Sequence, residues 1–121
     1  MKIAVIGSRD IKTFDLTNVI PSDTTQIISG GAIGVDTLAF EYATKHGIDI
    51  VVYLPNYAQY GKSAPIIRNK QIVENSDCVL AIWNGNSRGT KFTIDYAKKL
   101  GKKVILIVVD TSKTNNIALR Q

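Results

Sequence analysis

Three glycine-containing turns each follow a short apolar run that is typical of a buried β-strand. The turns are Gly7-Ser8-Arg9, the segment from Ser29 to Gly34, and the segment from Asn84 to Thr90. Glycine lets backbone N–H groups approach a ligand closely, and the positive end of a following helix favours an anion. Because the carboxyl ends of parallel strands open at one edge of a sheet, the three turns should meet there. The pattern predicts a pocket for a phosphorylated ligand, such as a nucleotide.

Two charged residues, one just after the second turn and one within the third, suit such a ligand. Asp36 lies in the first turn of a predicted helix, where it can balance the helix dipole or accept hydrogen bonds from ribose hydroxyls. The two roles can coexist. Arg88 lies where another helix should begin, and a cation is unfavourable at a helix N-terminus. An anionic ligand explains this arginine better, because guanidinium groups bind phosphate in a bidentate manner.

A further polar pair, Arg68-Asn69, lies in a predicted helix that Ser63 can cap. Asn69 falls on the apolar face with Ile66, Ile72 and Val73, and a buried amide needs hydrogen-bond partners. A neighbouring loop or the edge of a ligand can supply them. The predicted ligand-binding residues are therefore Gly7, Ser8, Arg9, Ser29, Gly30, Gly31, Gly34, Asp36, Arg68, Asn69, Asn84, Gly85, Ser87, Arg88, Gly89 and Thr90.

The element that should carry these turns is a sheet whose strands alternate with helices. We expect strands at Lys2–Ile6, Thr25–Ile28, Ile48–Leu54, Asp77–Trp83 and Lys103–Val109. We expect helices at Phe14–Ile20, at Gly34–His46, after Ser63, and from Thr90 to Leu100. Gly47 should terminate the second of these helices. The segment Pro55–Lys62 should be a loop, whose Tyr57 and Tyr60 either stack on a base or are ordinary surface residues.

The alternation predicts one α/β domain over residues 1–110. It should be a Rossmann-like, three-layer domain with a five-stranded parallel sheet, and we expect the strand order 3-2-1-4-5. Residues 111–121 are polar and aperiodic and should form a loose tail, although Ile117 and Leu119 can dock. The common Gly-x-Gly-x-x-Gly fingerprint does not follow the first strand, and there is no Walker motif.

Composition limits the remaining possibilities. The chain has 121 residues, 45% of them hydrophobic, and no apolar run long enough to span a bilayer or form a signal peptide. We expect a cytoplasmic protein. Cys78, the only cysteine, should be a buried core residue, and one cysteine with one histidine, His46, makes a zinc site improbable. The net charge of +5 suits anionic partners. Much of it flanks a helix C-terminus, where it matches the helix dipole, at Lys98, Lys99, Lys102 and Lys103.

Several short motifs, taken in order, resemble the SLOG superfamily, which includes DprA (Smf), YpsA and LOG proteins. They are Gly7-Ser8-Arg9, Ser29-Gly30-Gly31-Ala32-x-Gly34-x-Asp36-x-x-Ala39, Arg68-Asn69, Ser76-Asp77-x-Val79-x-Ala81 and Ser87-x-Gly89-Thr90. The spacing is most similar to the small YpsA-like branch, from Met1 to about Val109.

The resemblance implies a Rossmann-like fold that binds nucleotides or nucleotide-derived signals such as relatives of ADP-ribose, frequently as a homo-oligomer. By the same resemblance, Gly30, Gly31 and Gly34 would form a phosphate loop, and Gly89 with Thr90 a second phosphate turn. Ser8 and Arg9 would line the rim. The LOG enzymes carry a glutamate shortly after the second turn, whereas Lys91, Phe92 and Thr93 follow Thr90 here.

The leading hypothesis is therefore a binding module for a nucleotide or nucleotide-derived ligand, with a role in signalling or stress response and no certain cofactor. One alternative is a nucleotide N-glycosidase, or phosphoribohydrolase, for which Asp36 and Asp95 are weak catalytic candidates. Another is DprA-like binding of single-stranded DNA, suggested by the resemblance and the positive charge. A small-molecule partner is preferred over nucleic acid, and no membrane partner is expected.

Overall fold

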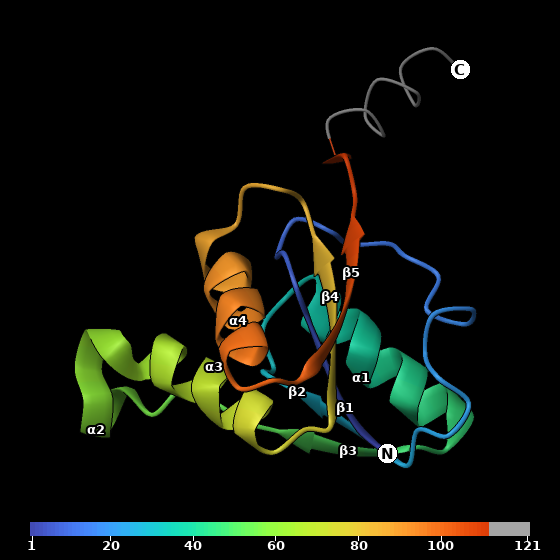
Figure 1. Cartoon of the computed structure of the whole chain (residues 1–121), viewed down its shortest axis with the longest axis horizontal. Helices are drawn as coiled ribbons and strands as arrows, with labels where there is room; N and C mark the ends of the chain where they lie inside the picture. The colour runs from blue at the N-terminus through green and yellow to red at the C-terminus, as the bar shows by residue number, and fades with distance from the viewer. Residues whose placement is uncertain (112–121) are drawn as a thin grey trace.

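A single parallel sheet organises the chain, of which the computed structural model describes residues 1–111 (Figure 1). The strand order is β3-β2-β1-β4-β5, with every neighbouring pair parallel. This confirms the predicted α/β fold and the order 3-2-1-4-5. The chain order reverses between β1 and β4, so the switch point of the sheet lies there. The strands are β1 (Lys2–Gly7), β2 (Gln26–Ser29), β3 (Asp49–Val52), β4 (Cys78–Trp83) and β5 (Lys103–Val108).

Helices cover both faces of the sheet (Figure 1). On one face α1 (Val35–His46) packs on Ile3 and Val5 of β1, and on the other α3 (Ala64–Glu74) and α4 (Arg88–Lys99) cover Ala4 and Ile6. Alternate residues of a strand point to opposite faces, which is why β1 serves both cores. The described residues therefore form the three-layer arrangement expected from the sequence.

The predicted helix at Phe14–Ile20 is wrong. The segment is a loop with one turn, in which the Asp15 carboxylate accepts a hydrogen bond from the Thr17 backbone N–H at 2.9 Å. Such a local side-chain bond offers the backbone an alternative to helix. Leu16 and Ile20 are still buried on the α1 side of the sheet, so the apolar residues of the segment serve the core without a helix.

The predicted loop at Pro55–Lys62 is also wrong, because it contains α2 (Tyr57–Tyr60) and the start of a 3₁₀ turn, η1 (Gly61–Ser63). Asn56 caps α2 by accepting a hydrogen bond from the Gln59 backbone N–H at 3.1 Å. Ser63 does not cap α3 with its side chain, since it ends the 3₁₀ turn in helical geometry. α4 instead begins two residues before the predicted Thr90, because Ser87 is its cap.

Three smaller predictions have clear outcomes. Cys78 is buried as expected, and Gly47 ends α1 in the left-handed conformation. The lysines expected at a helix C-terminus lie at and after the end of α4, where Lys102 also donates to the Ser76 carbonyl at 2.7 Å. Apart from Thr111, the predicted tail with Ile117 and Leu119 lies outside the described residues. Within residues 1–111, none of the helices has the length and apolar character needed to cross a bilayer.

Candidate functional site

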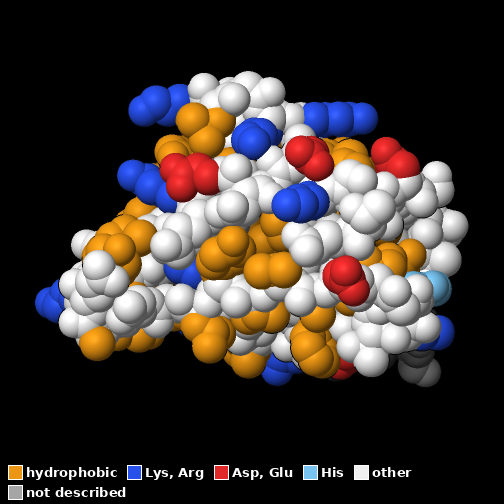
Figure 2. Space-filling model, turned by 90° about the horizontal axis from the view of Figure 1, so that it is seen from below, with side chains coloured by type: hydrophobic (Ala, Val, Ile, Leu, Met, Phe, Trp, Pro, Cys, Tyr) orange, Lys and Arg blue, Asp and Glu red, His pale blue; other side chains and the backbone are white. Residues whose placement is uncertain are grey.

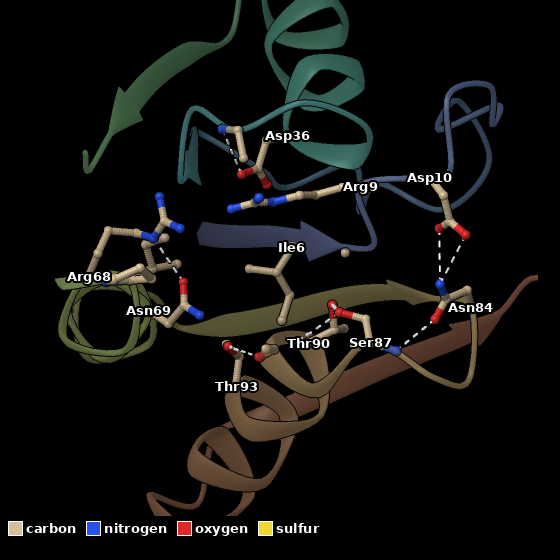
Figure 3. A pocket seen from close by; sticks show the side chains of 15 residues that line it. Ile6, Arg9, Asp10, Asp36, Arg68, Asn69, Asn84, Ser87, Thr90 and Thr93 are labelled. Atoms are coloured by element: carbon tan, nitrogen blue, oxygen red, sulfur yellow. Dashed lines mark hydrogen bonds between the residues drawn. The ribbon is translucent and has the colours of Figure 1, made fainter. Parts of the chain in front are cut away.

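A cavity of about 450 Å³ opens at the carboxyl edge of the sheet, at the switch point between β1 and β4 (Figure 3). The turns after β1 and β4 and the ends of α1, α3 and α4 surround it. Of the predicted site residues, it brings together Gly7, Arg9, Asp36, Arg68, Asn69, Asn84, Ser87, Gly89 and Thr90. The lining residues that the prediction missed are Ile6, Asp10, Ala32, Pro65, Ile72 and Thr93.

The remaining predicted residues lie beside the cavity or away from it. Ser8, Ser29, Gly30, Gly31, Gly34, Gly85 and Arg88 are not part of its lining, nor is Asp95. Asp95 is exposed and forms an ion pair with Lys91 at 2.8 Å. Arg88 is exposed at the start of α4. The two tyrosines of α2, Tyr57 and Tyr60, also lie outside the lining.

Most glycines of the three turns are required by packing of the chain on itself. A Cβ at Gly7 would overlap the Ile82 carbonyl and the Val35 side chain, and one at Gly34 would meet the backbone of Ser8 and Arg9. Gly34 also has φ of 78°, which side-chain-bearing residues rarely adopt. These glycines therefore allow the turns after β1 and β2 to touch, whether or not a ligand is bound.

Gly89 differs from these glycines. It lies in the first turn of α4 and lines the cavity, and a Cβ added there would have no atom within 4 Å. Nothing in the described chain needs this position to lack a side chain. The space beside Gly89 is therefore available to a ligand that approaches the N-terminal end of α4.

Arg68 is the central charged group of the site. Its side chain is only 7% exposed, and its Nη1 donates to the carbonyl oxygens of Gly30 and Tyr53, at 2.5 and 3.4 Å. Its Nε donates to Asn69 Oδ1 at 2.8 Å. The Nη2 group makes no hydrogen bond within residues 1–111. Burial lowers the pKa of Arg68, while Asp36 acts in the opposite direction.

The placement of Asn69 corrects the predicted apolar face of α3. Ile66, expected on that face, is 46% exposed, whereas Arg68 is buried along with Ile72 and Val73. The partner of Asn69 is Arg68 and not a neighbouring loop. Spacing alone does not distinguish a buried arginine next to an asparagine from an exposed pair, so no sequence signal could have predicted this arrangement.

Asp36 lines the same cavity near the start of α1, and its Oδ2 and Arg68 Nη1 both lie close to Gly30 (Figure 3). Its Oδ2 accepts a hydrogen bond from the Ala32 backbone N–H at 3.0 Å. Burial raises the pKa of this carboxyl group, and the Ala32 N–H, Arg68, Ser29 and Arg9 each oppose that change. Ser29 is 1% exposed, and its hydroxyl has no well-formed hydrogen bond in the described structure.

The Arg9 side chain extends into the cavity between Asp36 and Ile6 (Figure 3). It makes no hydrogen bond or ion pair with the residues that the structure describes. The cavity is therefore lined by two guanidinium groups with donors left unbonded within the described residues, Arg9 and Arg68, and by two carboxylates, the half-buried Asp36 and the exposed Asp10. Guanidinium groups in this state are suited to binding a carboxylate or phosphate.

The turn after β4 is held by its own hydrogen bonds. The Asn84 backbone N–H donates to Ser8 Oγ at 3.0 Å, and the Asn84 side-chain amide donates to both carboxylate oxygens of Asp10. The Ser8 hydroxyl therefore holds the turn after β4 in place, and Ser8 is not part of the cavity lining. Ser87 Oγ accepts a bond from the Thr90 backbone N–H at 3.4 Å and caps α4. These bonds fix the start of α4 against β1.

Thr93, which the sequence prediction missed, lies one turn after Thr90 on the cavity side of α4 and donates to the Gly89 carbonyl at 2.8 Å. Its position three residues after Thr90, on the same side of the predicted helix, is a sequence signal that could have identified Thr93 as a cavity residue.

No family model, curated protein or solved structure matches this chain. Among residues 1–111, no group of His, Cys, Asp and Glu side chains is suited to hold a metal ion.

Proposed function

We propose that this protein is a binding module that holds a nucleotide or nucleotide-derived molecule by its phosphate group in the cavity between β1 and β4. The observation that carries the proposal is the pair of guanidinium groups in one cavity. Arg68 is buried yet keeps Nη2 unbonded within the described chain, and Arg9 extends toward the same space (Figure 3). Guanidinium N–H groups bind phosphate oxygens through short, charge-assisted hydrogen bonds. An anion in the cavity would accept such bonds from both arginines.

The start of α4 supports the same assignment. The positive end of a helix attracts anions, and Gly89 leaves room for one beside that end. Asp36 would repel an anion placed against it but can accept hydrogen bonds from a sugar hydroxyl. The polar groups therefore suit a ligand with an anionic part near Arg9, Arg68 and Gly89 and a neutral, hydroxyl-bearing part near Asp36. The resemblance to the SLOG superfamily is consistent with this proposal.

The test is calorimetric titration with AMP, ADP-ribose, NAD, ATP and cyclic dinucleotides. We expect at least one of them to bind, and Arg9→Ala to weaken its binding by about tenfold or more. Gly89→Ala should weaken it to a similar extent, because the new methyl group enters the open space without disturbing the fold. Arg88→Ala is the matched control, since Arg88 lies outside the cavity lining. A folded protein that binds none of these compounds would contradict the proposal.

A second candidate, hydrolysis of the N-glycosidic bond of a nucleotide, is favoured by the environment of Asp36. This carboxylate lines the cavity, where it can stabilise a developing positive charge on the sugar. Asp95 lies on the exposed side of α4, paired with Lys91. Incubation with AMP or ADP-ribose, followed by chromatography, should release free base that disappears in Asp36→Asn and persists in Asp95→Asn. Absence of free base would leave the binding module as the proposed function.

A further inference from the structure

A second hollow, of about 320 Å³, lies next to the cavity between α1 and the edge strand β3. Its walls are largely apolar and are formed by Phe40 of α1 together with Val52 and Leu54 at the end of β3. We refer to these three side chains and the space between them as the β3 groove. Its size is at the lower end of the range of small-molecule pockets, about 300 to 1,000 Å³.

The side chains of the β3 groove are unusually exposed for large apolar groups. Phe40 is 51% and Leu54 68% exposed, and Ile33 nearby in the chain is also exposed. Figure 2, which views the molecule from the side of β3, shows hydrophobic side chains gathered across the middle of this face. An exposed apolar cluster of this kind marks a binding surface more often than isolated exposed residues do.

The groove is continuous with the polar cavity, because Asp36 and Ala32 line both. Asp36 uses Oδ2 to accept the bond from Ala32, and Oδ1 has no well-formed hydrogen bond within the described chain. An acceptor therefore lies at the junction of the apolar groove and the cavity that Arg9 and Arg68 line. The buried Ser29 hydroxyl, also without a well-formed hydrogen bond, lines the groove beside it.

The loop after β2 keeps the groove open. A Cβ at Gly31 would come within 2.8 Å of the side chains of both Leu54 and Val52, and Gly31 has φ of 70°. The position therefore suits only glycine, and its missing side chain leaves the apolar walls uncovered on that side. A flat ring can enter such a space, whereas a helix or a strand of another chain needs a longer surface than this hollow offers.

We propose that the β3 groove binds the aromatic base of the ligand whose phosphate lies near Arg9 and Arg68, with the sugar at Asp36 between them. This inference rests on the proposed function and extends it, because it assigns each part of a nucleoside phosphate to its own residues. The base packs on Phe40, and Leu54 covers it from the strand side. The tyrosines of α2 have no part in it.

The test compares three probes by NMR titration of the backbone amides: AMP, ribose 5-phosphate and adenosine. AMP should shift amides around both Gly89 and Leu54. Ribose 5-phosphate should shift those around Gly89 and leave the groove unchanged, and adenosine should do the reverse. Base stacking on an aromatic side chain contributes about 1 to 3 kcal/mol. AMP should therefore bind at least about fivefold more tightly than ribose 5-phosphate.

Variants separate the groove from the cavity. Phe40→Ala and Leu54→Ser should each weaken AMP binding by about fivefold or more and leave ribose 5-phosphate binding unchanged. Leu106→Ser is the matched control, because Leu106 is 43% exposed on β5, the opposite edge strand of the sheet. This variant should bind AMP like the parent protein.

Four outcomes would overturn the inference. Equal affinity for AMP and ribose 5-phosphate would show that the base is not bound in the groove, and it would leave the proposed function intact. The same conclusion would follow if adenosine shifted only amides outside the groove. A failure of AMP and ribose 5-phosphate to bind would overturn the inference, and it would contradict the proposed function as well if ADP-ribose, NAD, ATP and cyclic dinucleotides also fail to bind. If Phe40→Ala or Leu54→Ser instead converts a dimer to a monomer in analytical ultracentrifugation, the β3 groove is an interface between copies of the chain.

Discussion

The Nη1 of Arg68 donates a hydrogen bond to the carbonyl oxygen of Gly30, which lies 38 residues earlier in the chain. This bond joins α3 to the loop after β2, and the same nitrogen also reaches the Tyr53 carbonyl after β3. Arg68 thus ties together three segments on one side of the cavity. The residue proposed to bind an anion also holds the walls in place.

Arg68→Ala should lower the free energy of unfolding by about 2 kcal/mol, because it leaves two carbonyl groups without their charged donor. Urea denaturation measures this change. The matched control is Arg88→Ala, which removes an exposed arginine from the start of α4 and should change stability by less than about 0.5 kcal/mol. Equal effects of the two substitutions would show that Arg68 does not hold the loops.

Two glycines of the site should respond in opposite ways to the same substitution. Gly7→Ala should cost at least about 2 kcal/mol of stability, because the new methyl group overlaps the Ile82 carbonyl and the Val35 side chain. Gly89→Ala should raise stability by up to about 1 kcal/mol, since alanine favours helix and the space is open. Thermal and urea unfolding of the two variants give the comparison. A loss of stability in Gly89→Ala would mean that the space beside it is filled.

These two glycines also illustrate what the sequence can and cannot predict. The alternation of apolar runs and helical patterns predicted the sheet order, since parallel strands and right-handed crossovers leave few topologies. The topology in turn brought Arg9, Asp36 and Gly89 to one edge. The spacing did not show that Gly7 is required by packing and Gly89 is not, because that depends on contacts between distant segments.

The missed elements have a similar cause. Phe14–Ile20 has helical spacing, but the local bond from Thr17 to Asp15 stabilises a turn. The burial of Arg68 could not be predicted either, because its partners Gly30 and Tyr53 are far away in the chain. Local patterns predict helices and strands well where no side-chain hydrogen bond competes with the backbone hydrogen bonds. They do not predict which polar side chains are buried when the hydrogen-bond partners lie far away in the chain.

Stability should depend on pH through Asp36. Burial raises the pKa of this group in the folded protein above its ordinary value of 3.8, so the folded state holds the proton more tightly than the unfolded state. Its contribution to stability therefore decreases as the pH rises from 3.8 through the raised pKa. Asp36→Asn lacks this dependence and should be more stable than the parent protein near neutral pH, with the difference shrinking toward acidic pH. Urea denaturation of both proteins at several pH values tests this, and a constant difference would contradict it.

Cys78 should be inert in the folded protein. The thiol is 2% exposed, and burial raises its pKa, so little thiolate is present to react. A thiol-specific reagent at about pH 8 should modify it slowly, and stoichiometrically once urea unfolds the chain. Fast modification of the folded protein would indicate that β4, an interior strand between β1 and β5, opens readily.

The only tryptophan of the chain, Trp83, ends β4, and its indole N–H donates to the Ser87 carbonyl at 3.0 Å. Ser87 caps α4 and lines the cavity. The tryptophan fluorescence of the protein therefore comes from one indole ring that is hydrogen-bonded to the wall of the site. A molecule that shifts this wall changes the emission of one defined fluorophore, so occupancy can be followed optically in the unlabelled protein.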